Sequence, residues 1–186
     1  MSRKRLILTV VFSALTLLVV WAWSPWDSFR YHGDGEFSDR GFFAYPRYVA
    51  TFSDISLNEV SEHRFHFRGL PGEEMRLVLY LKGRSVDTFA EREPLEHLKT
   101  TIEAHLTDGH GGEACHGSGQ PESGERDGIW VLMSGGANGY WHANCIRVRV
   151  HPNESYTLMI RVTSTDPNGE KVVVTPKFEG GGIEFP

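Results

Sequence analysis

The chain has 186 residues, a formal net charge of −5 at pH 7 and 40% hydrophobic residues. This length suits a single domain with its own hydrophobic core. The acidic balance argues against a general nucleic-acid-binding protein, so we expect no nucleic-acid partner.

The N-terminal segment joins a basic tail, residues 1–5, to an uncharged run from Leu6 to Trp23. At about 1.5 Å per residue, this run would cover about 27 Å of a hydrocarbon layer about 30 Å thick. Basic residues flanking such a segment remain on the cytoplasmic side. The sequence therefore predicts a signal anchor in the lipid bilayer, with a cytoplasmic N-terminus and a periplasmic or extracellular C-terminal domain.

A cleaved secretory signal peptide is the alternative interpretation of this segment. Such peptides end in small residues, and Val20 and Ala22 suit a cleavage site after Ala22. We favour the retained anchor because the uncharged run is longer than usual and bulky tryptophans surround the site. Both interpretations export residues 24–186.

The exported part begins with a juxtamembrane segment, residues 24–45, rich in glycine, aspartate and aromatic residues. We expect its aromatic side chains to dock partly on the domain that follows; they are Phe37, Phe42, Phe43 and Tyr45. From residue 46 onward, apolar and polar residues alternate with the period of half-buried strands. The alternating runs cover residues 48–57, 63–70, 75–82, 101–106, 129–133, 140–151, 156–163 and 171–178.

Turn-forming residues separate several of these runs. Residues 70–74 (LPGEE) and 166–169 (DPNG) predict two antiparallel hairpins. Pro94 predicts a short helical turn that begins near it. The alternation slips near residues 144–145, which predicts a β-bulge there. Residues 107–128 contain seven glycines without apolar periodicity and predict a long loop.

About eight short strands with little helix predict an all-β domain over residues 46–186. We expect an extracytoplasmic antiparallel β-sandwich, either immunoglobulin-like or jelly-roll. These two arrangements differ in strand order, which alternation does not reveal.

Cys115 and Cys145 are the two cysteines of the chain. An even, small number of cysteines in an exported domain predicts a disulfide. Closing a loop of about 30 residues would stabilise the fold by about 3.5–4 kcal/mol.

Three histidines lie near these cysteines in sequence: His110, His116 and His142. Nitrogen and sulfur ligands hold zinc or copper, but this spacing matches no standard zinc motif. We therefore predict no resident metal or cofactor, and keep these histidines as the candidates for one.

Trp130, Tyr140 and Trp141 flank glycine-rich segments and are candidate contacts for a glycan. Core packing is the alternative, and we favour it because such rings bury much apolar area.

No catalytic motif occurs in the chain: it has no phosphate loop, dinucleotide fingerprint, HExxH sequence or nucleophile elbow. The sequence therefore favours a non-enzymatic role. Our first hypothesis is a membrane-anchored binding or assembly module with a protein partner in the cell envelope. The alternatives are a glycan-binding module and an extracytoplasmic hydrolase without a recognisable motif.

Overall fold

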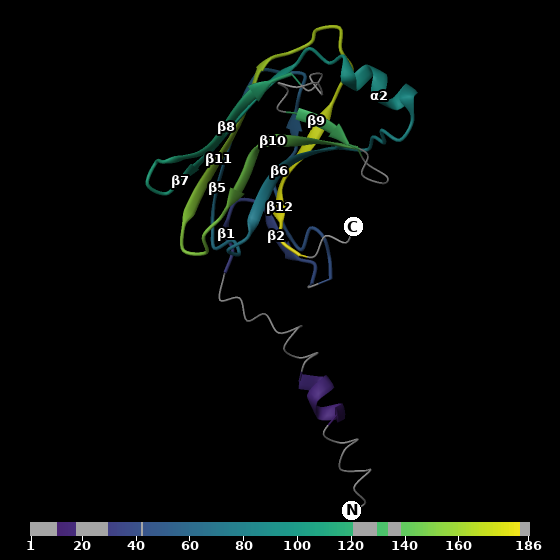
Figure 1. Ribbon diagram of the computed structural model, residues 1–186. Coiled ribbons are helices and arrows are strands. Elements are labelled where there is room, and N and C mark those ends of the chain that lie inside the picture. The colour runs from purple at the N-terminus through teal and green to yellow at the C-terminus, as the bar shows by residue number, and fades with distance from the viewer. Residues whose placement is uncertain (1–10, 18–29, 42, 121–129, 134–138, 183–186) are drawn as a thin grey trace, which may run out of the picture.

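The computed structural model of the chain describes residues 11–17, 30–41, 43–120, 130–133 and 139–182 (Figure 1). The strands in these residues form two antiparallel sheets that pack face to face around one hydrophobic core. This arrangement confirms the predicted all-β fold with two sheets.

The first sheet has five strands. In spatial order they are β1 (His32–Gly33), β5 (Ser61–Arg68), β11 (Ser155–Ser164), β7 (Thr101–Asp108) and β8 (Glu113–Gly119). Alternation along β5 shows why this sheet forms: Phe65 and Phe67 are buried, whereas Arg64 and His66 are exposed. β5 thus presents one apolar side to the core and one polar side to solvent.

The second sheet has seven strands. Its order is β2 (Glu36–Asp39), β3 (Tyr48–Thr51), β12 (Val173–Gly180), β6 (Glu74–Leu81), β10 (Tyr140–Arg149) and β9 (Trp130–Met133), and β4 (Ile55–Ser56) also pairs with β12. The predicted strand over residues 48–57 is therefore divided into β3 and β4.

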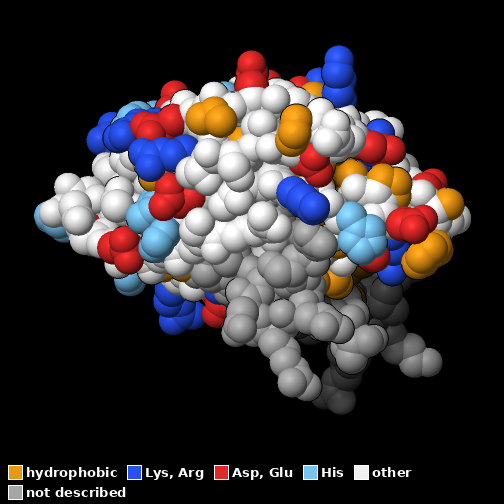
Figure 2. Space-filling view, turned by 90° about the horizontal axis from the view of Figure 1, so that it is seen from above, with side chains coloured by type: hydrophobic (Ala, Val, Ile, Leu, Met, Phe, Trp, Pro, Cys, Tyr) orange, Lys and Arg blue, Asp and Glu red, His pale blue; other side chains and the backbone are white. Residues whose placement is uncertain are grey.

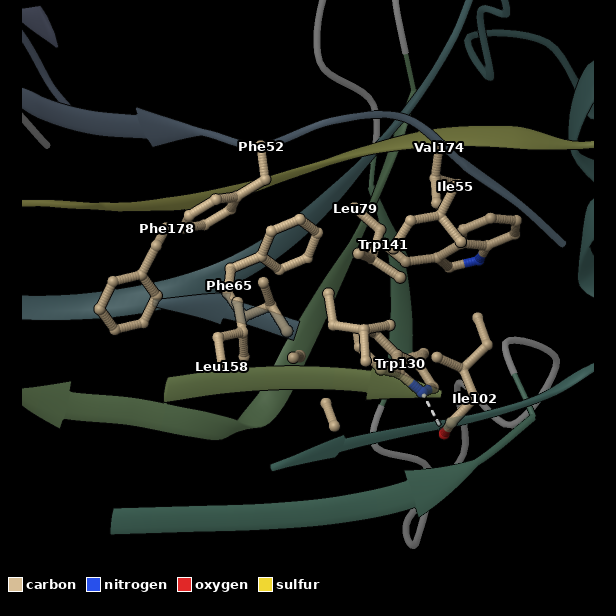
Figure 3. Close-up of a cluster of buried hydrophobic side chains, with 14 of the residues drawn as sticks. Phe52, Ile55, Phe65, Leu79, Ile102, Trp130, Trp141, Leu158, Val174 and Phe178 are labelled. Atoms are coloured by element: carbon tan, nitrogen blue, oxygen red, sulfur yellow. Dashed lines mark hydrogen bonds between the residues drawn. The ribbon is translucent and has the colours of Figure 1, made fainter. Parts of the chain in front are cut away.

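Large aromatic side chains fill the space between the sheets (Figure 3). Phe52 and Phe65 stack with ring centroids 4.6 Å apart. The indole N–H of Trp130 donates to the carbonyl oxygen of Ile102 at 3.3 Å, which satisfies its polar atom inside the core. The core thus links both sheets through rings from several strands.

Both predicted hairpins are wrong, although the chain does reverse at both places. β5 and β6 flank the first turn, and β11 and β12 flank the second, but in each case the two strands belong to different sheets. Turn residues mark a reversal of direction without specifying whether the next strand pairs with the last one. Here each turn carries the chain across the roughly 10 Å between packed sheets.

The segment expected to be juxtamembrane contributes strands to both sheets, since it contains β1 and β2. Phe37 stacks between Tyr31 and Tyr48, with centroid distances of 5.2 and 6.2 Å. Phe37 therefore docks on the core as expected. Phe42 lies outside the described residues, and Phe43 is 66% exposed.

The predicted long loop over residues 107–128 is in part a hairpin. β7 and β8 pair across a tight turn in which Asp108 Oδ1 accepts hydrogen bonds from the backbone N–H groups of His110 and Gly112, at 2.9 and 2.7 Å. Glycine-rich strand β8 lacks apolar alternation, which is why the pattern did not reveal it. Residues 121–129 lie outside the described part.

Helix α2 spans Phe89–Glu96. It therefore begins before Pro94, near which the sequence predicted its start. Thr88 caps it, because its side chain accepts from the Glu91 backbone N–H while the Glu91 carboxylate accepts from the Thr88 N–H. Pro94 therefore lies within the helix. In β10 the register shifts between His142 and Arg147, which confirms the predicted bulge.

Most of the predicted anchor, residues 6–23, lies outside the described part. Residues 11–17 are helical, and the Thr16 hydroxyl donates to the Phe12 carbonyl oxygen at 2.8 Å. Within the described residues, none of the helices has the length and apolar character needed to cross a bilayer.

Candidate metal centre

The outer face of the five-stranded sheet carries a network of charged side chains. Arg161 on β11 lies at its centre, donating from Nε to Glu62 at 2.9 Å and from Nη1 to Glu103 at 3.3 Å. Glu62 also pairs with Arg64 at 2.7 Å. Figure 2, which looks down on the end of the sandwich near α2, shows acidic, basic and histidine side chains interspersed and hydrophobic ones in small separate groups.

Hydrogen bonds from Arg161 and then from Arg64 hold the pKa of Glu62 below its ordinary value, and those from Glu62 raise the pKa of Arg161. This part of the network is therefore fully ionised at neutral pH.

Next to Arg161, Glu103, His105 and His116 bring three potential metal ligands together. Glu103 and His105 lie two residues apart on β7 and share one face, and His116 lies directly opposite His105 on β8. One ligand atom from each of the three lies within 4.8 Å of the other two.

The distances in this cluster are close to those of a metal site. Glu103 Oε1 lies 3.4 Å from His105 Nε2 and 3.5 Å from His116 Nε2. Two atoms that each bind a tetrahedral zinc ion at about 2.0–2.1 Å are about 3.4 Å apart. The carboxylate oxygen and each imidazole nitrogen are therefore already separated as ligands of one ion would be.

Two further side chains lie next to the ligands. Glu113 Oε2 lies 3.5 Å from Nδ1 of His105, the ring nitrogen that faces away from Glu103. Arg161 binds Glu103 Oε2, the oxygen that faces away from the histidines. Metal-binding histidines and carboxylates commonly have such outer partners, which orient them and raise ligand basicity.

The two imidazole rings are stacked, with centroids 3.7 Å apart and planes 20° from parallel. Binding one ion through both Nε2 atoms requires the two imidazole rings to tilt relative to each other, so that the lone pairs of the two Nε2 atoms converge on the ion. His105 is 25% and His116 is 39% exposed, so solvent has access to the cluster. Three protein ligands leave a fourth tetrahedral position for water or an external ligand.

Of the three sequence candidates for a metal ligand, the structure places only His116 in this cluster. His110 is at the β7–β8 turn, 86% exposed, with Nε2 3.7 Å from Glu154. His142 is on β10, in the other sheet. Sequence reasoning missed Glu103 and His105, although the alternation of β7 places both on its polar face.

The predicted disulfide remains a prediction. Cys115 precedes His116 and points the other way, partly buried against the core. Strand β8 contacts β10, the strand that contains Cys145, across the sandwich. The side chain of Cys145 lies outside the described part of the structure.

The predicted aromatic contacts lie in different environments. Trp130 and Trp141 are both 0% exposed and belong to the core, so neither presents a ring face to a sugar. Tyr140 is half-buried and stacks on Tyr80 with a centroid distance of 5.2 Å on the outer side of the seven-stranded sheet.

No protein-family model matches this chain, and no curated protein is significantly similar to it.

Proposed function

We propose that this protein is an exported, membrane-anchored β-sandwich that binds a divalent transition-metal ion through Glu103, His105 and His116. The observation that carries the proposal is the convergence of one carboxylate oxygen and two imidazole nitrogens from two paired strands. Two nitrogens and one oxygen suit zinc, and also copper or iron.

The surroundings of the cluster favour binding over catalysis. The cavity lined by Glu91 and Pro94 and the cavity lined by Glu74 and Glu179 include none of the three ligands. A solvent-facing ion with a free coordination position can instead accept a donor atom from another molecule. This supports a binding or assembly role, in which the ion completes a contact with an envelope partner.

The location in the proposal rests on the sequence. The uncharged run over residues 6–23 behind a basic tail supports an anchor, and it would present the sandwich outside the cytoplasm.

Titration of the full chain in detergent with Co²⁺, followed by its visible absorption, tests the metal proposal. We expect one ion per chain and its displacement by Zn²⁺. Binding should weaken as the pH falls below neutrality, because protons compete for the imidazole nitrogens. His105→Ala and His116→Ala should each weaken binding beyond the about 10–100-fold typical of losing an outer partner.

Two matched controls use other histidines. His66 lies on the outer face of the same sheet, 3.0 Å from Thr157, and His110 is the exposed sequence candidate. His66→Ala and His110→Ala should bind Co²⁺ like the unmodified chain. Equal losses in these controls, or binding retained in His116→Ala, would contradict the proposed site.

A further inference from the structure

A methionine lies next to the metal-binding cluster on the outer face of the five-stranded sheet. Met159 on β11 is paired directly with His105 on β7, and His105 is paired in turn with His116 on β8. Residues paired across antiparallel strands project their side chains from the same face, with Cβ atoms about 4.5–5.5 Å apart. The three side chains therefore form one row across β11, β7 and β8, which lie side by side in Figure 1.

The sulfur atom of Met159 lies beside the guanidinium that binds Glu103. Arg161 contacts Met159 Sδ from Nη2 at 3.9 Å and donates from Nη1 to Glu103 Oε2 at 3.3 Å. The thioether and the carboxylate thus share one neighbour. A methionine side chain has three rotatable bonds, so Sδ can turn from Arg161 toward His105 without movement of the backbone.

Met159 is an unusual residue for its position in the strand. Along β11 every second residue is buried in the core, and Met159 belongs to the outward-facing set, where it is half-buried. The other outward-facing residues of this strand are all polar or charged: Ser155, Thr157, Arg161 and Thr163. Packing in the core therefore does not account for this side chain, which places a soft, polarizable sulfur next to two imidazoles.

The candidate ligands differ in the ions that they select. A thioether favours monovalent copper, and imidazole suits both zinc and copper, whereas a carboxylate suits harder ions. The two histidines together with Glu103 therefore suit a divalent ion. The same histidines together with Met159 suit Cu⁺.

The charges around the cluster also favour a monovalent ion. Ion pairs connect the cluster to a network of three carboxylates and two guanidiniums, whose formal charges sum to −1; they are Glu62, Glu103, Glu113, Arg64 and Arg161. Cu⁺ would neutralise this network, whereas a divalent ion would leave it positive. Water screens the difference because these side chains are partly exposed, so charge adds to the preference that the sulfur sets.

We propose that this cluster is a copper site that prefers Cu⁺, with Met159 Sδ, His105 Nε2 and His116 Nε2 as its ligands. The inference rests on the proposed metal centre and names the ion that it prefers. Glu103 remains paired with Arg161 when Cu⁺ binds and acts as a ligand when a divalent ion binds. Two sets of ligands thus share the same two histidines, and substitutions can separate them.

Competition with the Cu⁺-binding dye bicinchoninate tests the site in the full chain in detergent, without oxygen and with ascorbate to keep the copper reduced. We expect one Cu⁺ per chain, bound more tightly than Co²⁺. Met159→Leu nearly conserves side-chain volume. It should weaken Cu⁺ binding by at least about 10-fold, the lower end of what even an outer partner contributes, and leave Co²⁺ binding unchanged. Glu103→Gln should have the reverse effect and weaken Co²⁺ binding more than Cu⁺ binding.

Met133→Leu is the matched control, because Met133 is 45% exposed and lies on β9 of the other sheet. This variant should bind Cu⁺ like the unmodified chain. X-ray absorption at the copper edge adds a measurement that needs no substitution, since a bound thioether gives copper–sulfur scattering. A variant with Cys115→Ser and Cys145→Ser should retain both Cu⁺ and this scattering, because neither thiol is a proposed ligand.

Unchanged Cu⁺ affinity in Met159→Leu, or no copper–sulfur scattering in the unmodified chain, would overturn the inference. Loss of Cu⁺ in the double cysteine variant would also overturn it and assign the copper to thiols. If Co²⁺ binding still depends on His105 and His116 in these cases, the metal centre stands and only its preference for Cu⁺ falls. Absence of both Co²⁺ and Cu⁺ binding would instead overturn the metal centre itself.

Discussion

The two outer faces of the sandwich treat their charged residues in opposite ways. On the five-stranded sheet, Glu62 and Arg161 form an ion pair in which both side chains are a third or more exposed. On the seven-stranded sheet, Glu179 is 1% exposed, and Arg76 is its one hydrogen-bonding partner among the described residues. The seven-stranded sheet thus buries one carboxylate, Glu179, although other ion pairs on that sheet, such as Arg147–Glu74, are exposed.

This difference has energetic consequences. Water and salt screen exposed ion pairs, so partners there exchange at little cost. A buried charge depends on its partner, because nothing else compensates its lost hydration. The outer face of the five-stranded sheet, called the open face below, is therefore suited to bind an ion from solvent. On the seven-stranded sheet, the buried Glu179 carboxylate instead needs a fixed donor.

The largest effect we expect concerns the connection between the two sheets. A Cys115–Cys145 disulfide would join edge strand β8 to β10 of the other sheet. Its reduction should lower the free energy of unfolding by about 3.5–4 kcal/mol, measured by urea titration with and without reductant. Identical urea midpoints, or free thiols by non-reducing mass analysis, would contradict the predicted bond.

Removing the partner of a buried charge should have an effect of similar size. Arg76→Ala leaves the Glu179 carboxylate buried without its donor and should cost about 3–5 kcal/mol of unfolding free energy. Arg64→Ala is the matched control on the open face, where the Arg64 side chain is 58% exposed, and its urea midpoint should barely move. Similar losses in both variants would remove the distinction between the faces.

A smaller effect should appear at the metal centre when a supporting residue is lost. Arg161→Ala keeps all three ligands but frees Glu103 Oε2, and should weaken Co²⁺ binding by about 10-fold. Unchanged Co²⁺ affinity would show that the guanidinium does not orient the carboxylate.

The smallest effects should appear at the extremes of pH, with opposite signs for the two faces. Burial, and then the charge of Glu179, raise the pKa of Tyr80 to about 12 from 10.0. The contribution of Tyr80 to the free energy of unfolding is therefore complete below pH 10 and is lost as the pH rises to about 12. Tyr80→Phe should make the unfolding free energy less dependent on pH in this alkaline range.

Glu62 behaves in the opposite direction, since its pKa is lowered from 4.5 by Arg161. Its contribution is present above pH 4.5 and is lost as the pH falls through the lowered pKa, so Glu62→Gln should flatten the acid limb. Urea midpoints across pH check both limbs. An acid effect of Tyr80→Phe or an alkaline effect of Glu62→Gln would contradict this assignment.

The sequence alone determined the local properties of the strands. Period-2 alternation identified the buried side of β5 from Phe65 and Phe67, because a half-buried strand has to segregate apolar from polar residues. The slip near residues 144–145 likewise indicated the bulge in β10, since an extra residue reverses the faces. Such features depend only on neighbours along the chain.

Tertiary structure alone decided which strands pair and which side chains meet. The turns at residues 70–74 and 166–169 specify reversals, but packing of the sheets decides that the chain crosses between them. Glu103 and His105 share a face through their spacing, yet His116 joins them only because glycine-rich β8 pairs with β7 in one register. Glu179 is hidden for the same reason: burial of a charge depends on segments distant in sequence, and no local pattern records it.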